Sequence, residues 1–110
     1  MIRKLLKAML MSAAFSLPLL AADSAGDHIV GQKNKAFTQD ELTVKVGEKI
    51  IFKNDDDVRH NVFSKSEGFE FNLKMQAPGT ESTISFDKEG TVEVRCALHP
   101  KMKLIVHVQN

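Results

Sequence analysis

Thr91–Val108 reads TVEVRCALHPKMKLIVHV, two runs of alternating apolar and polar residues on either side of a short loop. Alternation with a period of two is the pattern of a β-strand that has one face buried. Between the two runs stand the single cysteine of the chain, Cys96, and then His99 and Met102. This stretch therefore predicts two β-strands that hold three potential metal ligands between them.

Strand parity predicts which of these side chains face the interior. Side chains alternate between the two faces of a strand, so Cys96 shares a face with the valines of TVEVRC, at the end of that strand. Met102 has the parity of the apolar residues of the last strand, whereas His107 has the opposite parity and should face outward. His60 opens the run HNVF and shares the parity of its valine. We therefore expect Cys96, Met102 and His60 to meet at one end of the fold, beside His99 in the loop.

The chain after residue 26 has the pattern of β-strands throughout. Turn signals stand at residues 54–57, 78–79 and 89–90. Residues 64–76 are irregular and leave room for a short helix. These features predict an all-β fold, an antiparallel β-sandwich of about seven strands with Greek-key connections. The expected strands are LTVKV (42–46), KIIFKN (49–54), HNVF (60–63), STISF (82–86), TVEVRC (91–96) and KLIVHV (103–108), with a weaker one at 28–32.

Residues 1–22 have the composition of a secretory signal peptide. Basic residues at the start are followed by an apolar run from Ala8 to Leu20, and two alanines at 21–22 offer a cleavage point. The apolar run is short for a bilayer span and contains Pro18. We predict a helical signal peptide at 1–22, export to the periplasm, and a mature domain at 23–110 with no membrane span. The alternative is that this segment stays as a membrane anchor or an amphipathic surface helix.

The expected mature chain has 88 of the 110 residues, which suits one small domain. Without Arg3, Lys4 and Lys7 it carries 12 Lys and Arg against 14 Asp and Glu, a balance that gives no support to nucleic-acid binding. A single cysteine excludes an internal disulfide. An exported chain would then carry a free thiol into an oxidising compartment unless something protects it, and a bound metal would do so.

One thiolate, two imidazoles and one thioether form a ligand set that suits copper. Two neutral nitrogens and a soft thiolate favour a trigonal copper site, and a thioether is a weak axial ligand that favours copper over zinc. Cys96, His99 and Met102 follow one another at intervals of three residues, whereas His60 comes from 36 positions before the cysteine. Pro100 fixes its own φ and has no N–H, so it stiffens the loop beside His99.

The motifs HNVF, after DDDVR, and CALHPKM, near the end of the chain, resemble the two ligand motifs of the cupredoxins, the small blue-copper proteins. The resemblance is greatest to amicyanin, which has the same short spacing before the methionine, and to plastocyanin, and it covers roughly residues 28–110. It implies one copper ion per chain, alternating between Cu(I) and Cu(II), bound by His60, Cys96, His99 and Met102. It also implies that Asn61 ties the two ligand loops together by hydrogen bonds.

The resemblance further implies a function. Cupredoxins carry single electrons, so the chain is expected to be an electron carrier and not an enzyme, with a redox donor and acceptor docking near His99 at the surface. We expect it to be a monomer. The loop departs from the amicyanin pattern at Ala97, Leu98 and Lys101, and Lys101 adds a positive charge next to the predicted ligands. Together with Arg59 it would form a mildly basic rim that steers an acidic partner.

Other interpretations of the same residues stay open. The chain could buffer or deliver copper with the same ligands, or it could hold a structural zinc ion, which would be colourless. Cys96 and His99 could form a thiol nucleophile, although no third orienting group is evident. The run Asp55–Asp57 is expected to be a solvated turn, Met75 to pack in the interior, and His28 to have no special role.

Overall fold

Nine β-strands make up the part of the chain that the computed structural model describes, residues 26–110. The predicted signal peptide at 1–22, with its helix, lies outside the described residues. Within residues 26–110, no helix long and apolar enough to cross a membrane is found. The strands are β1 (Asp27–Lys33), β2 (Ala36–Phe37), β3 (Glu41–Lys45), β4 (Lys49–Asn54), β5 (His60–Ser64), β6 (Phe71–Gln76), β7 (Glu81–Ser85), β8 (Gly90–Arg95) and β9 (Lys103–Gln109).

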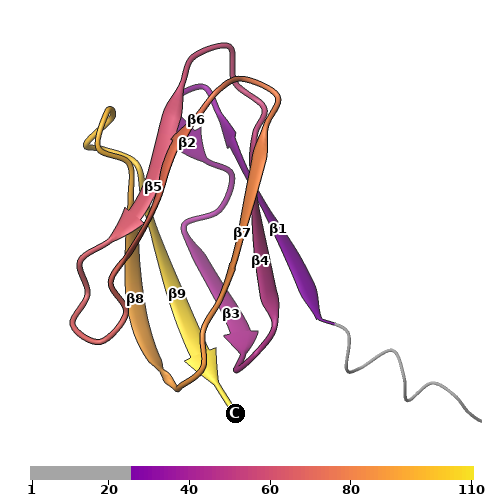
Figure 1. Cartoon of the computed structure of the whole chain (residues 1–110), viewed down its shortest axis with the longest axis vertical. Coiled ribbons are helices and arrows are strands. Elements are labelled where there is room, and N and C mark those ends of the chain that lie inside the picture. The colour runs from indigo at the N-terminus through magenta and orange to yellow at the C-terminus, as the bar shows by residue number, and fades with distance from the viewer. Residues whose placement is uncertain (1–25) are drawn as a thin grey trace, which may run out of the picture.

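The strands form two sheets that pack face to face (Figure 1). One sheet has the order β2-β1-β4-β7 and the other the order β3-β9-β8-β5-β6. The predicted all-β sandwich is thus confirmed. Two of the pairings, β1 with β4 and β3 with β9, are parallel, whereas the prediction described an antiparallel sandwich. Alternation along one strand identifies the face that is buried, but it carries no information on the direction of the neighbouring strand.

The apolar core lies between the two sheets and follows the predicted parity. Cys96 and Met102 are each 2% exposed and belong to this core, and the outward-facing His107 contacts Glu41 on β3 through a 2.9 Å hydrogen bond. The other core residues come from both sheets: Val30, Phe37, Val44, Ile50, Phe52, Val62, Phe86, Val92, Val94, Leu104, Val106 and Val108. The inward orientation predicted for the strands at 91–96 and 103–108 is therefore confirmed.

Residues 65–70 are irregular as expected, but residues 71–76 form the edge strand β6 and the segment 64–76 contains no helix, so the expectation is wrong for its second half. The pairing of β5 with β6 slips by one residue between Asn61 and Phe63, and Lys74 has a positive φ of 67°. An extra residue in a strand reverses the alternation of its side chains beyond that point. Gln76 is buried as a result, and Met75 is 51% exposed where interior packing was expected.

A buried polar network ties the two sheets together at one end of the sandwich. Gln32 on β1 donates from Nε2 to Oε1 of Gln76 on β6 over 2.8 Å. Gln76 donates in turn to the carbonyl of Phe52, and Asn54 donates to the carbonyl of Gln76. Gln76 is also the cross-strand neighbour of His60. The network therefore stiffens both sheets directly behind that histidine, because buried hydrogen-bonded groups are costly to separate.

Candidate metal centre

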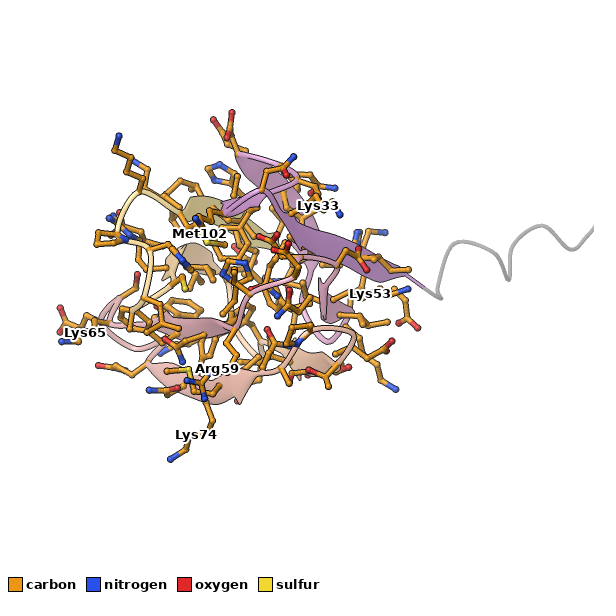
Figure 2. All side chains as sticks on the ribbon, turned by 90° about the horizontal axis from the view of Figure 1, so that it is seen from above. Lys33, Lys53, Arg59, Lys65, Lys74 and Met102 are labelled. Atoms are coloured by element: carbon orange, nitrogen blue, oxygen red, sulfur yellow. The ribbon has the colours of Figure 1, made fainter. Side chains whose placement is uncertain are left out.

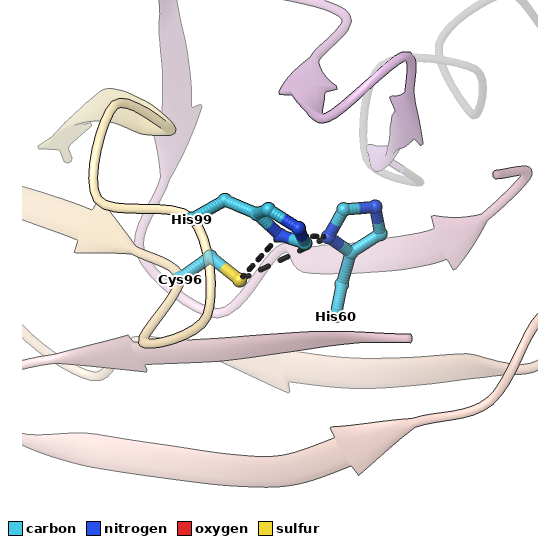
Figure 3. Close-up of side chains that lie close together, drawn as sticks. All are labelled: His60, Cys96 and His99. Atoms are coloured by element: carbon cyan, nitrogen blue, oxygen red, sulfur yellow. Dashed lines mark hydrogen bonds between the residues drawn. The ribbon is translucent and has the colours of Figure 1, made fainter. Parts of the chain in front are cut away.

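Three predicted ligands meet at this end of the sandwich. His60 is the first residue of β5, Cys96 directly follows β8, and His99 lies in the loop between β8 and β9. Nδ1 of His60 lies 3.1 Å from Nδ1 of His99, and Sγ of Cys96 lies 3.9 Å and 3.8 Å from these two nitrogens. Figure 3 shows the two rings and the thiol turned toward one another. His60 and Cys96 are buried, and His99 is partly exposed.

The distances among these three donor atoms fit one metal ion. His60, Cys96 and His99 could therefore hold one ion between them. Two imidazole nitrogens and one thiolate sulfur form a donor set that suits copper. Cys96, a free and buried cysteine, is thus placed where a metal would protect its thiol.

The tautomer of His60 also suits metal binding. Its Nε2 lies 2.9 Å from Oδ2 of Asp56, whose side chain is 7% exposed. A carboxylate only accepts hydrogen bonds, so Nε2 carries the proton and Nδ1 offers a lone pair toward His99 and Cys96. A carboxylate on the far nitrogen of a ligand histidine orients the ring and raises its basicity.

Asp56 contacts a predicted ligand, His60, although the run Asp55–Asp57 was expected to be a solvated turn. Asp55 and Asp57 are exposed as expected, but Asp56 points inward. The backbone N–H of Lys35, 2.8 Å away, and the ring of His60 hold the pKa of Asp56 far below its ordinary value, so it stays ionised. A carboxylate four residues before a predicted ligand histidine was the signal that could have identified it.

Asn61 ties the two ligand loops together, as the resemblance implied. Its backbone N–H donates to Sγ of Cys96 over 3.3 Å, and its side-chain oxygen accepts from the N–H of Ala97 over 3.2 Å. Its side-chain nitrogen donates to Asn72 and to the carbonyl of Lys74 on β6. The sulfur is therefore held between two segments, and a hydrogen bond to it is one of the factors that set a copper potential.

The loop from Cys96 to Met102 is closed by its own hydrogen bonds. The N–H of Met102 donates to the carbonyl of His99 over 2.9 Å, and Arg95 donates to the carbonyl of Pro100 over 2.6 Å. Met102 is buried at the end of this loop, directly before β9. In Figure 2 it lies within the body of the molecule. Its role as the fourth ligand stays a prediction.

His99 has the electrostatic environment of a neutral imidazole. Burial lowers its pKa below the ordinary value, and the neighbouring His60 and Lys35 lower it further, while Asp56 acts in the opposite direction. A metal binds only the neutral ring, so a lowered pKa extends the pH range in which His99 can act as a ligand.

Known proteins identify the family of the chain. A profile described as copper binding proteins of the plastocyanin/azurin family matches residues 27–109. The chain is a cupredoxin of this family. The cofactor of this cupredoxin is copper, and His60, Cys96 and His99 are close enough to one another to form a copper site.

Among relatives of this cupredoxin, the methylamine utilization protein MauL of Methylorubrum extorquens is 31% identical over 91% of this chain and 90% of its own length. Amicyanin of Paracoccus versutus is 31% identical over 78% of this chain and 68% of its own. A reduced Cu(I) form of an amicyanin variant at pH 4 has a TM-score of 0.71 and 27% identity, over 81% of this chain and 89% of that one. A purple cupredoxin from Nitrosopumilus maritimus, at 24% identity and a TM-score of 0.67, covers 76% of this chain and all of its own, and shares the fold.

Proposed function

We propose that this cupredoxin carries single electrons between redox proteins, with one copper ion per chain alternating between Cu(II) and Cu(I). Cys96 would supply the thiolate, His60 and His99 the imidazoles, and Met102 a weakly bound thioether sulfur. The similarity to amicyanin and MauL supports this function.

The observation that carries the proposal is that two of the donor side chains, Cys96 and His60, are held in place by other protein groups. Asn61 donates to the sulfur of Cys96, Asp56 holds the ring of His60, and the Gln32–Gln76 network stiffens the sheets behind them. A site that is held in place rearranges little when the metal changes its oxidation state. Little rearrangement allows fast electron transfer, because the barrier to the transfer grows with the movement of the ligands.

The partly exposed His99 is the expected exit for the electron, and partners would dock around it. No bond in a substrate is made or broken, so the proposed activity is not enzymatic. Export belongs to the same proposal: a signal peptide at 1–22 would direct the mature domain, 23–110, to the periplasm, where it would act as a monomer.

The visible spectrum of the copper-loaded protein tests this proposal. We expect one copper ion per chain and an intense thiolate-to-copper absorption band that disappears on reduction and returns on reoxidation. Cys96→Ala should abolish the band, whereas Met102→Ala should keep copper binding and shift the potential. A colourless copper complex, or a band that does not return on reoxidation, would refute the electron carrier.

One observation favours copper buffering or delivery as a second candidate. His99 is partly exposed and lies in a loop, so a competing ligand could reach the metal from that side. A buffer should surrender copper to a Cu(I) chelator quickly, whereas an electron carrier should retain it and exchange electrons quickly. Metal release and electron self-exchange, measured on the same sample, separate the two functions.

A further inference from the structure

A lysine occupies a strained position next to the candidate copper site. β1 and β2 pair Lys33 with Ala36, so Asn34 and Lys35 form a two-residue hairpin turn. Both have positive φ, 54° and 59°. Such turns favour asparagine followed by glycine, since a side chain is disfavoured in the left-handed region. The backbone conformation of residue 35 is therefore less favourable for lysine than it would be for glycine. A strained residue at a site is a reason to look for a function of its side chain.

The turn is fastened to the copper site through one carboxylate. Oδ2 of Asp56 accepts the N–H of Lys35 at 2.8 Å and also contacts Nε2 of His60 at 2.9 Å. The backbone of Lys35 is thus fixed relative to the ligand, and its ammonium group is carried on a side chain that is exposed. The backbone from which this charge extends is therefore held at a fixed place relative to His60.

The side chain of Lys35 lines a surface hollow around His99. The other lining residues are Leu98, His99, Pro100 and Lys101. Leu98 is 44% exposed and gives the hollow an apolar wall. Two cationic groups from segments far apart in sequence therefore flank the exposed side of a predicted ligand, around an apolar contact surface.

Charge is distributed unevenly along the molecule. We define the copper end as residues 33–35, 53–59, 74–81 and 95–103, where β1, β4, β6 and β8 end and β5, β7 and β9 begin. The copper end holds eight cationic and four acidic side chains. The rest of residues 26–110 holds four cationic and nine acidic side chains. Figure 2, a view from above, shows several of these cations projecting outward. The eight are Lys33, Lys35, Lys53, Arg59, Lys74, Arg95, Lys101 and Lys103.

We propose that Lys35 and Lys101 flank His99 as a cationic docking surface for the acidic face of a partner redox protein. This inference rests on the proposed electron-carrier function and adds the charge of the partner to it. Leu98 and Pro100 would supply the apolar contact, and the positive copper end would steer the encounter, because opposite surface potentials speed association. Steering of this kind weakens as salt screens the charges.

Stopped-flow electron exchange with two forms of one probe tests the proposal. Native cytochrome c is basic and its succinylated form is acidic, while the haem is the same. The copper-loaded protein should exchange electrons faster with the acidic form, and that rate should fall as ionic strength rises. Lys35→Glu and Lys101→Glu should each slow the acidic form about threefold or more at low salt. Lys49→Glu, at the exposed start of β4 and outside the copper end, should leave the rate unchanged.

Lys35→Gly removes the charge of Lys35 without disturbing the turn, so it distinguishes a role of the charge from a role in folding. Glycine suits the left-handed backbone, so this variant should unfold at the same or higher denaturant concentration and still react more slowly with the acidic probe. A loss of rate that accompanies a loss of stability would indicate a structural role and overturn the docking surface.

The other possible outcomes distinguish the electron-carrier proposal from the docking-surface proposal. Equal, salt-independent rates with both forms of cytochrome c would overturn the docking surface and leave the electron carrier intact. A blue copper protein that exchanges electrons with neither form would refute the carrier and the docking surface together. Binding to anionic phospholipid vesicles that is lost in Lys35→Glu, with no change toward the acidic cytochrome, would assign these lysines to a membrane surface and overturn the proposal.

Discussion

Asn61→Ala should destabilise the protein by separating the two ligand loops. The side chain of Asn61 makes three hydrogen bonds, with the N–H of Ala97 (3.2 Å), the side chain of Asn72 (2.9 Å) and the carbonyl of Lys74 (3.2 Å). The residue is 4% exposed, so water cannot replace these partners freely. Each bond contributes about 0.5–1.5 kcal/mol, so we expect the free energy of unfolding to fall by about 2–4 kcal/mol.

Urea unfolding of the copper-free protein measures this loss, and the midpoint should fall with little change in the slope. Asn72→Ala serves as the matched control, because Asn72 is exposed and its Oδ1 accepts one of the three side-chain bonds of Asn61, together with the exposed N–H of Lys74. It should cost about 1 kcal/mol. The backbone N–H to the sulfur of Cys96 survives in both variants, so the blue band should remain.

A loss of less than about 0.5 kcal/mol in Asn61→Ala would refute the reasoning, because ordinary surface substitutions have effects of that size. Equal losses of unfolding free energy in Asn61→Ala and Asn72→Ala would show that Asn61 stabilises the protein through its contact with β6 and not by joining the two ligand loops. Copper should stabilise the variant as much as the natural chain if the donor atoms keep their positions, since the gain depends on the binding constant.

Further substitutions and one titration test other parts of the site. Asp56→Asn should raise the reduction potential, measured by voltammetry, because it removes a negative charge that favours Cu(II) through His60; an unchanged potential would contradict this role. The copper-free protein should lose stability as pH falls below the ordinary imidazole value of 6.5, because His99 takes up a proton less readily when folded. His99→Gln should reduce this dependence in urea unfolding at several pH values, and an identical pH profile in the variant would argue against it. Lys74→Gly should raise the free energy of unfolding by about 0.5–1 kcal/mol, because Lys74 has a φ of 67° and glycine avoids the left-handed penalty, less the extra entropy of glycine in the unfolded chain; a lower stability would show that its side chain is needed.

The sequence alone determined the strands at 91–96 and 103–108 and the inward direction of Cys96 and Met102. It also determined that His60 would face them. These are local properties, because apolar alternation along one strand reports which face is buried whatever the neighbour is. The choice of copper followed from ligand chemistry, which depends on residue types and spacing.

The tertiary structure decided what depends on distant segments. The parallel pairs β1–β4 and β3–β9 and the bulge that exposes Met75 arise between strands far apart in the sequence. The side chain of Asp56 points inward because the N–H of Lys35, 21 positions earlier, donates to it and because His60 contacts it. The same contact brings Lys35 beside His99. The pattern of one segment does not predict contacts between distant segments, because these contacts depend on how the two sheets pack against each other.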